Sequence, residues 1–294
     1  MDEYKVKIDE IIGNYIKKCT YNKKIINAIE YVLYGGKRLR SSLTLSIMDT
    51  LNSQQSQSLQ SPQPQSQSLC NVALVPEFIH TASLVIDDLP AFDNSSIRRE
   101  QKCIHLKENE GIAYLVSFTL LTDSIMIIND QLPILKTMYP MEEAYKIYEI
   151  EMQNLLENMS ASRAIDGQLL STYHLNPNEV LTTEEIYDIL VKKTSSFFEI
   201  SLITGWIFGG GSMSLLPKVK KCAELLGVCY QICDDFQDYN EDTDISHNYV
   251  KHVGKDQSHI NLCKYKEELR TILVEIGLDN DTMLAYIINV LLIE

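Results

Sequence analysis

Apolar residues recur three and four positions apart along almost the whole chain, and this spacing limits the fold more than any other feature. No stretch alternates apolar and polar residues convincingly, as a half-buried strand would. The pattern predicts an all-α protein, a single-domain bundle of about ten or more helices around a central cavity. We expect helices at residues 2–19, 22–34, 38–51, 71–88, 108–130, 141–172, 183–208, 217–240, 256–276 and 280–293.

Glycine and proline mark the ends of several of these helices. Gly35-Gly36 should separate the second helix from the third, and Pro90 should end the fourth near Asp88, because proline cannot lie deep inside a helix. Gly209 to Gly211, followed by Pro217, indicate a connection between two later helices. Residues 52–69 are rich in Gln and Ser and have too few apolar side chains to offset the entropy of ordering, so they predict a disordered insertion.

Charge and cysteine content exclude some classes of function. The formal net charge of −14 argues against nucleic acid as a partner. Seven cysteines without a CxxC motif predict free thiols in a reducing compartment. The longest uncharged apolar stretch, 112–122, is shorter than the roughly 18 residues of a membrane span. We therefore expect no integral membrane segment and no cleavable leader. The expected location is the cytoplasm, with a plastid or another organelle as the alternative if a transit peptide has been removed.

Three carboxylates and two arginines lie within DDLPAFDNSSIRR, residues 87–99. The mostly apolar residues before this segment predict a buried helix that ends at Asp87 and Asp88. Two adjacent acids are costly to bury there unless a cation or hydrogen bonds neutralise them. Mg²⁺ suits such a pair and usually keeps substrate phosphates among its ligands. Arg98 and Arg99 would then bind phosphate oxygens. A solvated acidic loop is the alternative for this motif taken alone.

A second acidic segment, GVCYQICDDFQDY at residues 227–239, favours the metal-binding interpretation. Asp234 and Asp238 are four positions apart and so share one helix face. Near the N-terminus, GGKRLR at 35–40 adds glycines and three cations before an apolar run. Two carboxylate clusters on separate helices, with separate basic motifs, suggest a metal-bridged site that accommodates two phosphorylated ligands.

The ordered set of motifs resembles the trans-prenyltransferases, isoprenyl diphosphate synthases of the geranylgeranyl diphosphate synthase type. The matching pieces are GGKRLR, FIHTASLVIDDLPAFDNSSIRR, DGQ at 166–168, KKTSSFF at 192–198, YQICDDFQD and GKD at 254–256. The resemblance implies an isoprenoid synthase fold, with residues 1–294 as one polyprenyl synthase domain. It also implies a reaction in which an allylic diphosphate ionises, the carbocation alkylates isopentenyl diphosphate, and a proton is lost.

The resemblance assigns residue roles by motif position. The metal ligands would be Asp87, Asp88, Asp93, Asp234 and Asp238, holding Mg²⁺, about three ions per site, with Mn²⁺ as the alternative. The isopentenyl diphosphate site would consist of Gly36, Lys37, Arg40, His80 and Arg99. The allylic diphosphate site would consist of Arg98, Lys193, Thr194, Gln231 and Lys251. Asp87, Asp88, Asp93, Lys193 and Asp234 would be the catalytic set. Taken singly, His80 has the alternative of a core histidine and Lys193 that of a solvated lysine.

Several positions depart from the family pattern. Ser95 and Ser96 follow Asp93 where acids are common, and Glu100 stands where glycine is usual. The other departures are Ser117-Phe118 in place of Gly-Asp, Ser171 in place of an aspartate, and His259 in place of a lysine. Because the missing acid at 171 would help to set the metal-water shell, weakened turnover and dependence on a partner subunit are both open.

The preferred hypothesis is a Mg²⁺-dependent short-chain prenyl diphosphate synthase that condenses isopentenyl diphosphate with dimethylallyl, geranyl or farnesyl diphosphate. We expect a homodimer, with a heteromer as the alternative. The rival functions are a catalytically weak regulatory subunit of a heteromeric synthase, a farnesyl diphosphate synthase, and a terpene cyclase. A cyclase is disfavoured because it has no second diphosphate to bind.

Product length would depend on the helix before Asp87. A growing chain anchored there would pass Ser83 and Ala82 at about 6–7.5 Å and Phe78 at about 13.5 Å. Ala82 and Ser83 are small and leave the upper channel open, whereas Phe78 is either the floor of the channel or a plain core residue. We expect a product of about twenty carbons on this geometry.

Overall fold

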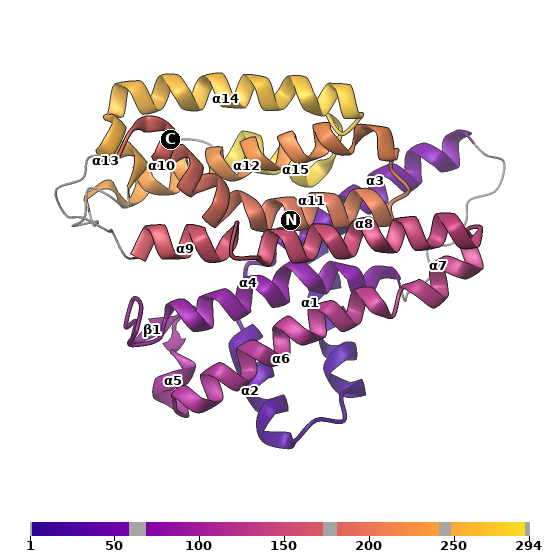
Figure 1. Cartoon of the computed structure of the whole chain (residues 1–294), viewed down its shortest axis with the longest axis horizontal. Helices are drawn as coiled ribbons and strands as arrows, with labels where there is room; N and C mark the ends of the chain where they lie inside the picture. Colours follow the sequence, from indigo (N-terminus) through magenta and orange to yellow (C-terminus); the bar gives the residue numbers. More distant parts are fainter. Residues whose placement is uncertain (1, 59–68, 173–180, 241–247, 292–294) are drawn as a thin grey trace. The chain divides into compact units, whose positions relative to one another are not determined.

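The computed structural model describes residues 2–58, 69–172, 181–240 and 248–291, and helices form nearly all of this described chain (Figure 1). The predicted all-α class is confirmed. The α-helices are α1 (Asp2–Lys18), α2 (Lys23–Leu33), α3 (Leu39–Ser58), α4 (Leu74–Asp87), α5 (Ile104–Lys107), α6 (Glu110–Asn129), α7 (Leu132–Met138), α8 (Met141–Met159), α9 (Ala164–Thr172), α10 (Thr183–Leu190), α11 (Ser196–Phe208), α12 (Leu216–Gln237), α13 (Tyr249–Val253), α14 (Lys255–Ile276) and α15 (Thr282–Tyr286).

Shorter elements join or interrupt these helices. Single 3₁₀ turns are η1 (Leu69–Ala73), η3 (Met213–Leu215) and η4 (Asp238–Asn240). Turns of π-helix are η2 (Val191–Ser195) and η6 (Ile287–Leu291). Two antiparallel strands of two residues each are β1 (Ile97–Arg98) and β2 (Gln101–Lys102).

The chain divides into two compact units. One consists of Met1–Leu45 and Gln63–Met152, and the other of Ser46–Pro62 and Gln153–Glu294. Each unit has its own set of buried apolar side chains. That the two form one domain around a central cavity, as the sequence predicts, stays a prediction.

In the first unit, α4 packs mainly against α6. The Ser117 hydroxyl of α6 donates a hydrogen bond to the Ala82 carbonyl of α4 at 3.3 Å, and Ala82 is fully buried. Phe78 is also fully buried, and its ring meets that of Tyr15 edge-on, 5.3 Å between centroids. Asp123 of α6 is buried and accepts a hydrogen bond of 2.7 Å from the Tyr21 hydroxyl. Apolar packing and a few buried polar contacts thus fix the helix that carries the first acidic motif.

The core of the second unit is formed by α11, α12 and α14. The buried cysteines of α12, at 222, 229 and 233, pack in this core, and the seven cysteines are thiols outside any disulfide bond, as predicted. Gly227 of α12 lies against Ser195, whose side chain would collide with any Cβ at position 227. Glycine therefore allows α12 to approach the π-helical turn η2 closely.

The predicted breaks at Gly35-Gly36, Pro90 and Gly209 to Gly211 are confirmed, but two predicted helices are each interrupted. Residues 141–172 form α8 and α9 with a turn between them, and residues 183–208 form α10 and α11 with the π-helical turn η2 between them. Apolar spacing alone does not reveal such breaks, since it continues on both sides of a single irregular turn.

The predicted start of the disordered insertion at residue 52 is wrong, because α3 continues to Ser58. Polar side chains of this extension bind carbonyl groups instead of packing apolar surface. Gln54 donates a 2.7 Å hydrogen bond to the Gly277 carbonyl, and Gln55 donates one of 3.0 Å to the Gly210 carbonyl. The predicted end at residue 69 is also wrong, because Leu69 is buried at the start of η1. Residues 59–68 of the predicted insertion lie outside the described residues.

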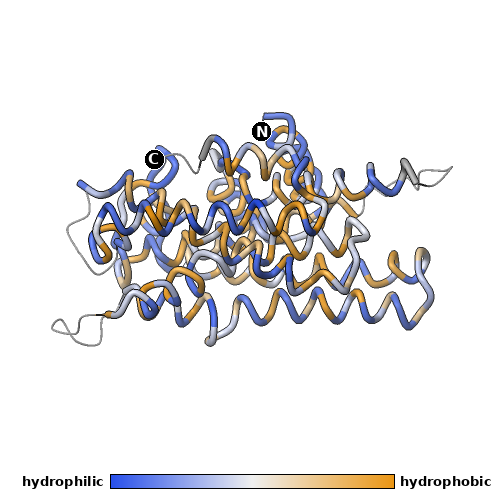
Figure 2. Tube along the Cα trace, turned by 90° about the horizontal axis from the view of Figure 1, so that it is seen from above, coloured by the Kyte–Doolittle hydropathy of each residue, from blue (hydrophilic) through white to orange (hydrophobic). Residues whose placement is uncertain are grey.

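Along most helices, short hydrophobic and hydrophilic stretches follow one another, as in helices with one apolar face (Figure 2). Two helical stretches, Leu69–Asp87 and Glu110–Met138, are nevertheless long and apolar enough to cross a membrane by length and composition alone. Of these windows, 67% and 44% are buried inside the protein. Core helices pass the same test, so neither stretch is a clear membrane span.

Candidate active site

The first acidic motif lies where α4 ends. The N–H of Asp93 donates a hydrogen bond to the Asp87 carbonyl at 2.9 Å, and the N–H of Asn94 donates one to the Leu89 carbonyl at 3.0 Å. Asn94 adopts a left-handed conformation (φ 49°), which asparagine tolerates better than most residues. This turn brings Asp93 back beside Asp87. Both carboxylates therefore lie at the end of α4. Asp93 is exposed there and Asp87 is half-buried.

Asp88 differs from the other two acids of the motif, Asp87 and Asp93, because it is buried and bound to Arg98. The guanidinium donates hydrogen bonds of 2.6 Å from Nη2 and 3.0 Å from Nε to Oδ1. The hydrogen bond to Asp88 raises the pKa of Arg98. Burial, followed by a hydrogen bond to Asp88, raises the pKa of the Cys103 thiol to about 12. Arg98 therefore neutralises the Asp88 carboxylate in this structure, mainly through Oδ1.

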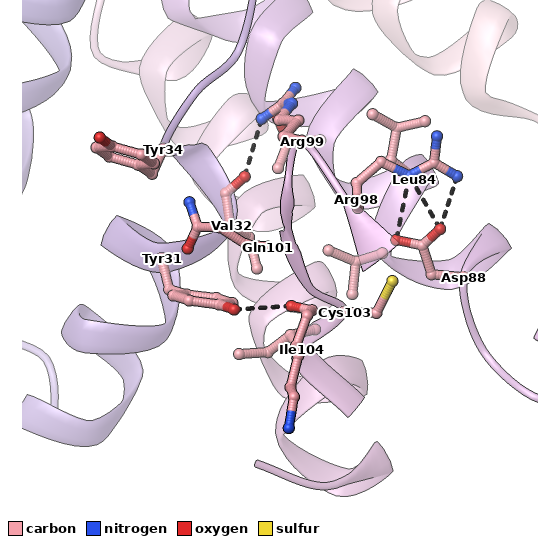
Figure 3. A pocket seen from close by; sticks show the side chains of 13 residues that line it. Tyr31, Val32, Tyr34, Leu84, Asp88, Arg98, Arg99, Gln101, Cys103 and Ile104 are labelled. Atoms are coloured by element: carbon pink, nitrogen blue, oxygen red, sulfur yellow. Dashed lines mark hydrogen bonds and ion pairs between the residues drawn. The ribbon is translucent and has the colours of Figure 1, made fainter. Parts of the chain in front are cut away.

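A pocket of about 370 Å³, including its open mouth, lies beside this ion pair (Figure 3). Its walls come from the end of α2, from α4 and from the β1–β2 hairpin. In Figure 3 the Arg98 guanidinium lies over the Asp88 carboxylate, while the Tyr31 hydroxyl donates a 2.7 Å hydrogen bond to the Lys102 carbonyl. These contacts fix the hairpin to both helices.

The hairpin determines where the second arginine lies. Strands β1 and β2 pair Arg98 with Gln101, so Arg99 and Glu100 form a two-residue turn. Both turn residues have positive φ, 52° and 62°, as in a type I′ turn. Left-handed backbone costs residues other than glycine about 1–2 kcal/mol, which is a physical reason for the glycine that the family resemblance leads us to expect at position 100. Sequence reasoning missed this hairpin, since strands of two residues are too short to show a period.

The surroundings of His80, in the first unit, are positively charged. The pKa of the imidazole is held well below its ordinary value, first by burial and then by the charges of Arg40, Arg99 and Arg98. The charges of three guanidinium groups thus act on one imidazole ring. Lys37 is exposed in the connection between α2 and α3. The structure therefore brings three of the predicted isopentenyl diphosphate ligands, Arg40, His80 and Arg99, into one basic region, and a fourth, Gly36, lies against Arg99.

Arg38 and Glu77 are site residues that sequence reasoning did not single out. Arg38 is buried and donates hydrogen bonds to Asp9 at 2.8 Å and to Glu77 at 2.7 Å. A Cβ at Gly36 would lie 2.9 Å from the Glu77 carboxylate and would collide with Arg38. The available signal was Glu77 itself, because a single acid in an apolar helix needs a cation. Gly36 is required here by this packing of charged side chains.

The second acidic motif ends α12. The N–H of Asp238 donates a hydrogen bond to the Asp234 carbonyl, and both side chains are exposed on the last turn of the helix. Asp235, between them, is buried and accepts a 2.7 Å hydrogen bond from the Tyr249 N–H. The Asp235 carbonyl also accepts a 2.8 Å hydrogen bond from the Asn248 side chain. Asp235 thus holds the start of α13, which leaves Asp234 and Asp238 at the surface.

The π-helical turn η2 positions the predicted allylic ligands Lys193 and Thr194. The Lys193 ammonium donates a 2.9 Å hydrogen bond to Ser171, and the Thr194 hydroxyl donates one of 2.8 Å to Gln231. Gln231 in turn donates a 2.9 Å hydrogen bond to Asp235. Turns of π-helix occur frequently at functional sites.

Glycine and a neighbouring lysine support this turn. A Cβ at Gly167 would collide with the backbone of Lys193, so α9 approaches η2 only because residue 167 is glycine. Lys192 forms ion pairs with Asp166 at 2.8 Å and with Asp188 at 2.7 Å, whereas its neighbour Lys193 binds Ser171. Lys251, on α13, is half-buried with its ammonium 5.4 Å from the centre of the Tyr239 ring.

The predicted ligands therefore form two half-sites, one in each unit. Within the described ranges, no three His, Cys, Asp or Glu side chains form a group that would hold a metal unaided. Each unit does supply exposed or half-buried carboxylates, Asp87 with Asp93 and Asp234 with Asp238. Oxygen ligands of this kind fit Mg²⁺, which usually binds one or two carboxylates together with water and substrate phosphates.

An all-α isoprenoid synthase fold with two acidic and basic half-sites defines a class of diphosphate-using transferases. Residues 22–263 match the model of the polyprenyl synthetase family, and the chain belongs to that family. It is therefore a prenyltransferase.

Similar proteins agree with this assignment. A trans-prenyltransferase of African swine fever virus is 26% identical over 267 residues, which cover 91% of this chain and 76% of the viral protein. Geranylgeranyl pyrophosphate synthase 4 of Arabidopsis thaliana is 30% identical over 236 residues, 79% of this chain and 57% of that protein. The crystal structure of a geranyltransferase from Helicobacter pylori, complexed with magnesium and isoprenyl diphosphate, has a TM-score of 0.75 at 23% identity and covers 99% of this chain and 95% of that chain.

Proposed function

We propose that the protein is a Mg²⁺-dependent short-chain prenyl diphosphate synthase. It would condense isopentenyl diphosphate with dimethylallyl, geranyl and farnesyl diphosphate. The observation that carries the proposal is a basic region in which the charges of Arg40, Arg98 and Arg99 all act on His80, in the same unit as Asp87 and Asp93. A diphosphate supplies the negative charge that this basic region needs.

The donor set supports magnesium as the metal. Asp87, Asp93, Asp234 and Asp238 would hold it, with Asp88 recruited from its pair with Arg98. Bound Mg²⁺ would stabilise the negative charge that develops on a leaving diphosphate. The Helicobacter pylori relative, which was crystallised with magnesium and isoprenyl diphosphate, supports the same assignment.

The protein's own side chains would bind and orient the two substrates. Lys37, Arg40 and Arg99 would hold isopentenyl diphosphate by charge-assisted hydrogen bonds, and neutral His80 would donate a further hydrogen bond. Lys193, fixed by Ser171, and Thr194, fixed by Gln231, would hold the allylic diphosphate together with Lys251. No dedicated general base is required if the departing diphosphate accepts the proton.

For the product we propose geranylgeranyl diphosphate, with farnesyl diphosphate as the alternative. The Arabidopsis relative named for this product supports it. At about 100° per residue, Ser83 lies on the same face of α4 as Asp87, whereas Phe78 lies about half a turn away. Phe78 also packs on Tyr15, which favours its core role over a channel floor.

For the assembly we propose a homodimer. Leu115, Phe118 and Met126 are large apolar residues of α6 that are each more than half exposed. They recur at helical spacing and so form an apolar stripe, which a second copy of the chain would cover. Light scattering of the purified protein measures this directly. A protein that is monomeric until a different subunit is added would contradict the homodimer.

One assay tests the function. Purified protein is incubated with Mg²⁺, labelled isopentenyl diphosphate and each allylic primer in turn, with a chelator as the control. Elongation by the protein alone, abolished by the chelator, supports the proposal. Activity that appears only with a partner would identify a regulatory subunit, and a hydrocarbon product without diphosphate would identify a terpene cyclase.

A further inference from the structure

Glu77 is an acid in the middle of an apolar core helix. Only 2% of its side chain is exposed, and its neighbours Val75, Pro76 and Phe78 are equally buried. A carboxylate in such surroundings is retained only if cations and hydrogen bonds offset its desolvation. The contacts of Glu77 therefore indicate what the residue is for.

Two guanidinium groups share one oxygen of this carboxylate. Arg38 donates a hydrogen bond to Oε1 at 2.7 Å, and Arg99 reaches the same atom at 3.5 Å. Arg99 also donates a 2.9 Å hydrogen bond to the Val32 carbonyl, and Arg38 donates one to the Leu33 carbonyl, so both bind the end of α2. Glu77 thus joins α2, the GGKRLR segment and the β1–β2 hairpin.

The two arginines would repel each other without this carboxylate. Burial lowers the pKa of Arg99, and the nearby charges of Arg38 and Arg98 lower it further, whereas Glu77 opposes this decrease. Asp9 also neutralises Arg38, at 2.8 Å, but no contact described in this part of the chain joins Asp9 to Arg99. Glu77 is therefore the shared counter-charge that holds Arg99 beside Gly36 and Arg38.

We propose that Glu77 is a positioning residue for the diphosphate of isopentenyl diphosphate. It would fix the Arg99 guanidinium and the Gly36–Arg38 backbone, and so set the direction in which Arg99, Lys37 and Arg40 present their donors. The inference rests on the proposed function of this half-site. It makes Glu77 necessary for the affinity of one substrate, although the carboxylate itself repels that substrate.

Because of this repulsion, the proposal can be tested by whether substitution of Glu77 raises or lowers the affinity for isopentenyl diphosphate. If Glu77 acted only through its charge, Glu77→Gln would bind isopentenyl diphosphate more tightly and Glu77→Asp would leave the affinity unchanged. If Glu77 positions the arginines, both variants weaken binding, because glutamine loses the charge pairing and aspartate is too short to reach both guanidinium groups. The matched control is Asp9→Asn, which removes the other carboxylate on Arg38 and leaves Arg99 untouched.

The experiment measures KM for isopentenyl diphosphate, KM for the allylic primer and kcat for the wild type and the three variants, with thermal unfolding to confirm that each is folded. We expect KM for isopentenyl diphosphate to rise about tenfold or more in both Glu77 variants, with less than a threefold change for the primer. Asp9→Asn should leave both constants within about twofold. Unchanged or tighter binding of isopentenyl diphosphate in Glu77→Gln would overturn the proposal, as would an equal loss in Asp9→Asn. If Glu77→Gln fails to fold, Glu77→Asp carries the test.

A second readout separates this proposal from the proposed function. Inorganic pyrophosphate is titrated calorimetrically without Mg²⁺ into Lys193→Ala protein, in which the other predicted diphosphate site is weakened. Adding Glu77→Gln to that background should weaken the remaining binding by about tenfold. If the wild type does not elongate any primer, the proposed function fails, and this titration still decides whether Glu77 positions an anion site. Equal or tighter pyrophosphate binding would refute the positioning role.

Discussion

The Lys193 ammonium group donates a hydrogen bond to the Ser171 hydroxyl across 2.9 Å. The family resemblance leads us to expect an aspartate at position 171, whereas the lysine is held here by a neutral partner. We predict that Ser171→Asp raises turnover and lowers the Mg²⁺ concentration for half-maximal activity by roughly tenfold, because a carboxylate at this position would order water bound to the proposed metal. Ser171→Ala is the control and should raise KM for the allylic primer. A Mg²⁺ requirement that is the same in all three proteins would show that residue 171 has no influence on the metal.

Asp87→Ala and Asp234→Ala should each lower turnover by at least about a hundredfold while leaving the fold intact. Each substitution removes a carboxylate from one of the two half-sites that would hold metal. The fold should survive, because both side chains lie at helix ends and adjacent acids repel each other without metal. Steady-state kinetics at saturating Mg²⁺ and circular dichroism measure the two properties. Near-normal elongation by either variant would contradict a site in which both clusters bind metal.

The basic residues of the two predicted diphosphate sites should affect the binding of different substrates. Lys37→Ala and Arg40→Ala should weaken binding of isopentenyl diphosphate, whereas Lys193→Ala and Lys251→Ala should mainly weaken binding of the allylic substrate. Loss of one charge-assisted contact typically lowers affinity by about tenfold to a hundredfold. Titration of each substrate against each variant shows the pattern. An equal loss for both substrates in all four variants would exclude the assignment.

Product length should respond to the face of α4 that carries Asp87. Ser83 is half-buried on that face, so Ser83→Tyr should block a growing chain and shift the product from about twenty to about fifteen carbons. Ala82→Tyr should shorten the product too, but at a cost in stability, because Ala82 is fully buried next to α6. Phe78→Ala tests the channel floor and would lengthen the product only if Phe78 faces the chain. Chromatography of the dephosphorylated products decides. If Ser83→Tyr and Ala82→Tyr leave the product unchanged, another helix sets its length.

Asp123 should make the protein less stable at neutral pH than at acid pH. Burial raises the pKa of Asp123, although hydrogen bonds from Tyr21 and Tyr15 oppose the increase. Because its pKa is higher in the folded state than in the unfolded state, the folded state binds this proton more tightly. The stabilisation is complete below the unfolded pKa, and it is lost as the pH rises through the folded pKa. We therefore expect Asp123→Asn to unfold at a higher temperature than the wild type at pH 7, with the difference vanishing below about pH 4.

The control for this prediction is Tyr21→Phe. It removes the 2.7 Å hydrogen bond to Asp123 and keeps the carboxylate. It should lower the unfolding temperature at pH 7, because a buried carboxylate then loses a partner. Thermal scans of the three proteins between pH 3.5 and pH 8 measure both effects. A constant difference between Asp123→Asn and the wild type over this range would show that Asp123 does not titrate as described.

The sequence was sufficient to identify the helical class, the breaks at Gly35-Gly36 and Pro90, and the order of the motifs. Each of these depends on local chemistry. Helical spacing continues over many residues, proline removes a backbone donor, and Gly35 adopts the positive φ (73°) that ends a helix and that glycine adopts without strain. Motif order also sufficed to place the chain in its family, because the spacing of acids and cations along the chain is itself the signal.

Only the tertiary structure distinguished residues that look alike in sequence. Asp87 and Asp88 are neighbours, yet Asp88 is buried against Arg98 while Asp87 is half-buried beside Asp93. Lys192 and Lys193 diverge in the same way, one toward Asp166 and the other toward Ser171. Adjacent residues on a helix point about 100° apart, and which direction meets a partner depends on helices remote in sequence.

The roles of Arg38, Glu77 and Gly36 were likewise decided by packing. The ion pair of Arg38 with Glu77 joins residues 39 positions apart, and no local pattern encodes such a distance. The sequence determined that an acid would occupy an apolar helix and that cations would follow a glycine pair. Which cation neutralises that acid, and which remain available to a substrate, was decided only when α2, α4 and the hairpin came together, because the cost of burying charge depends on every neighbour at once.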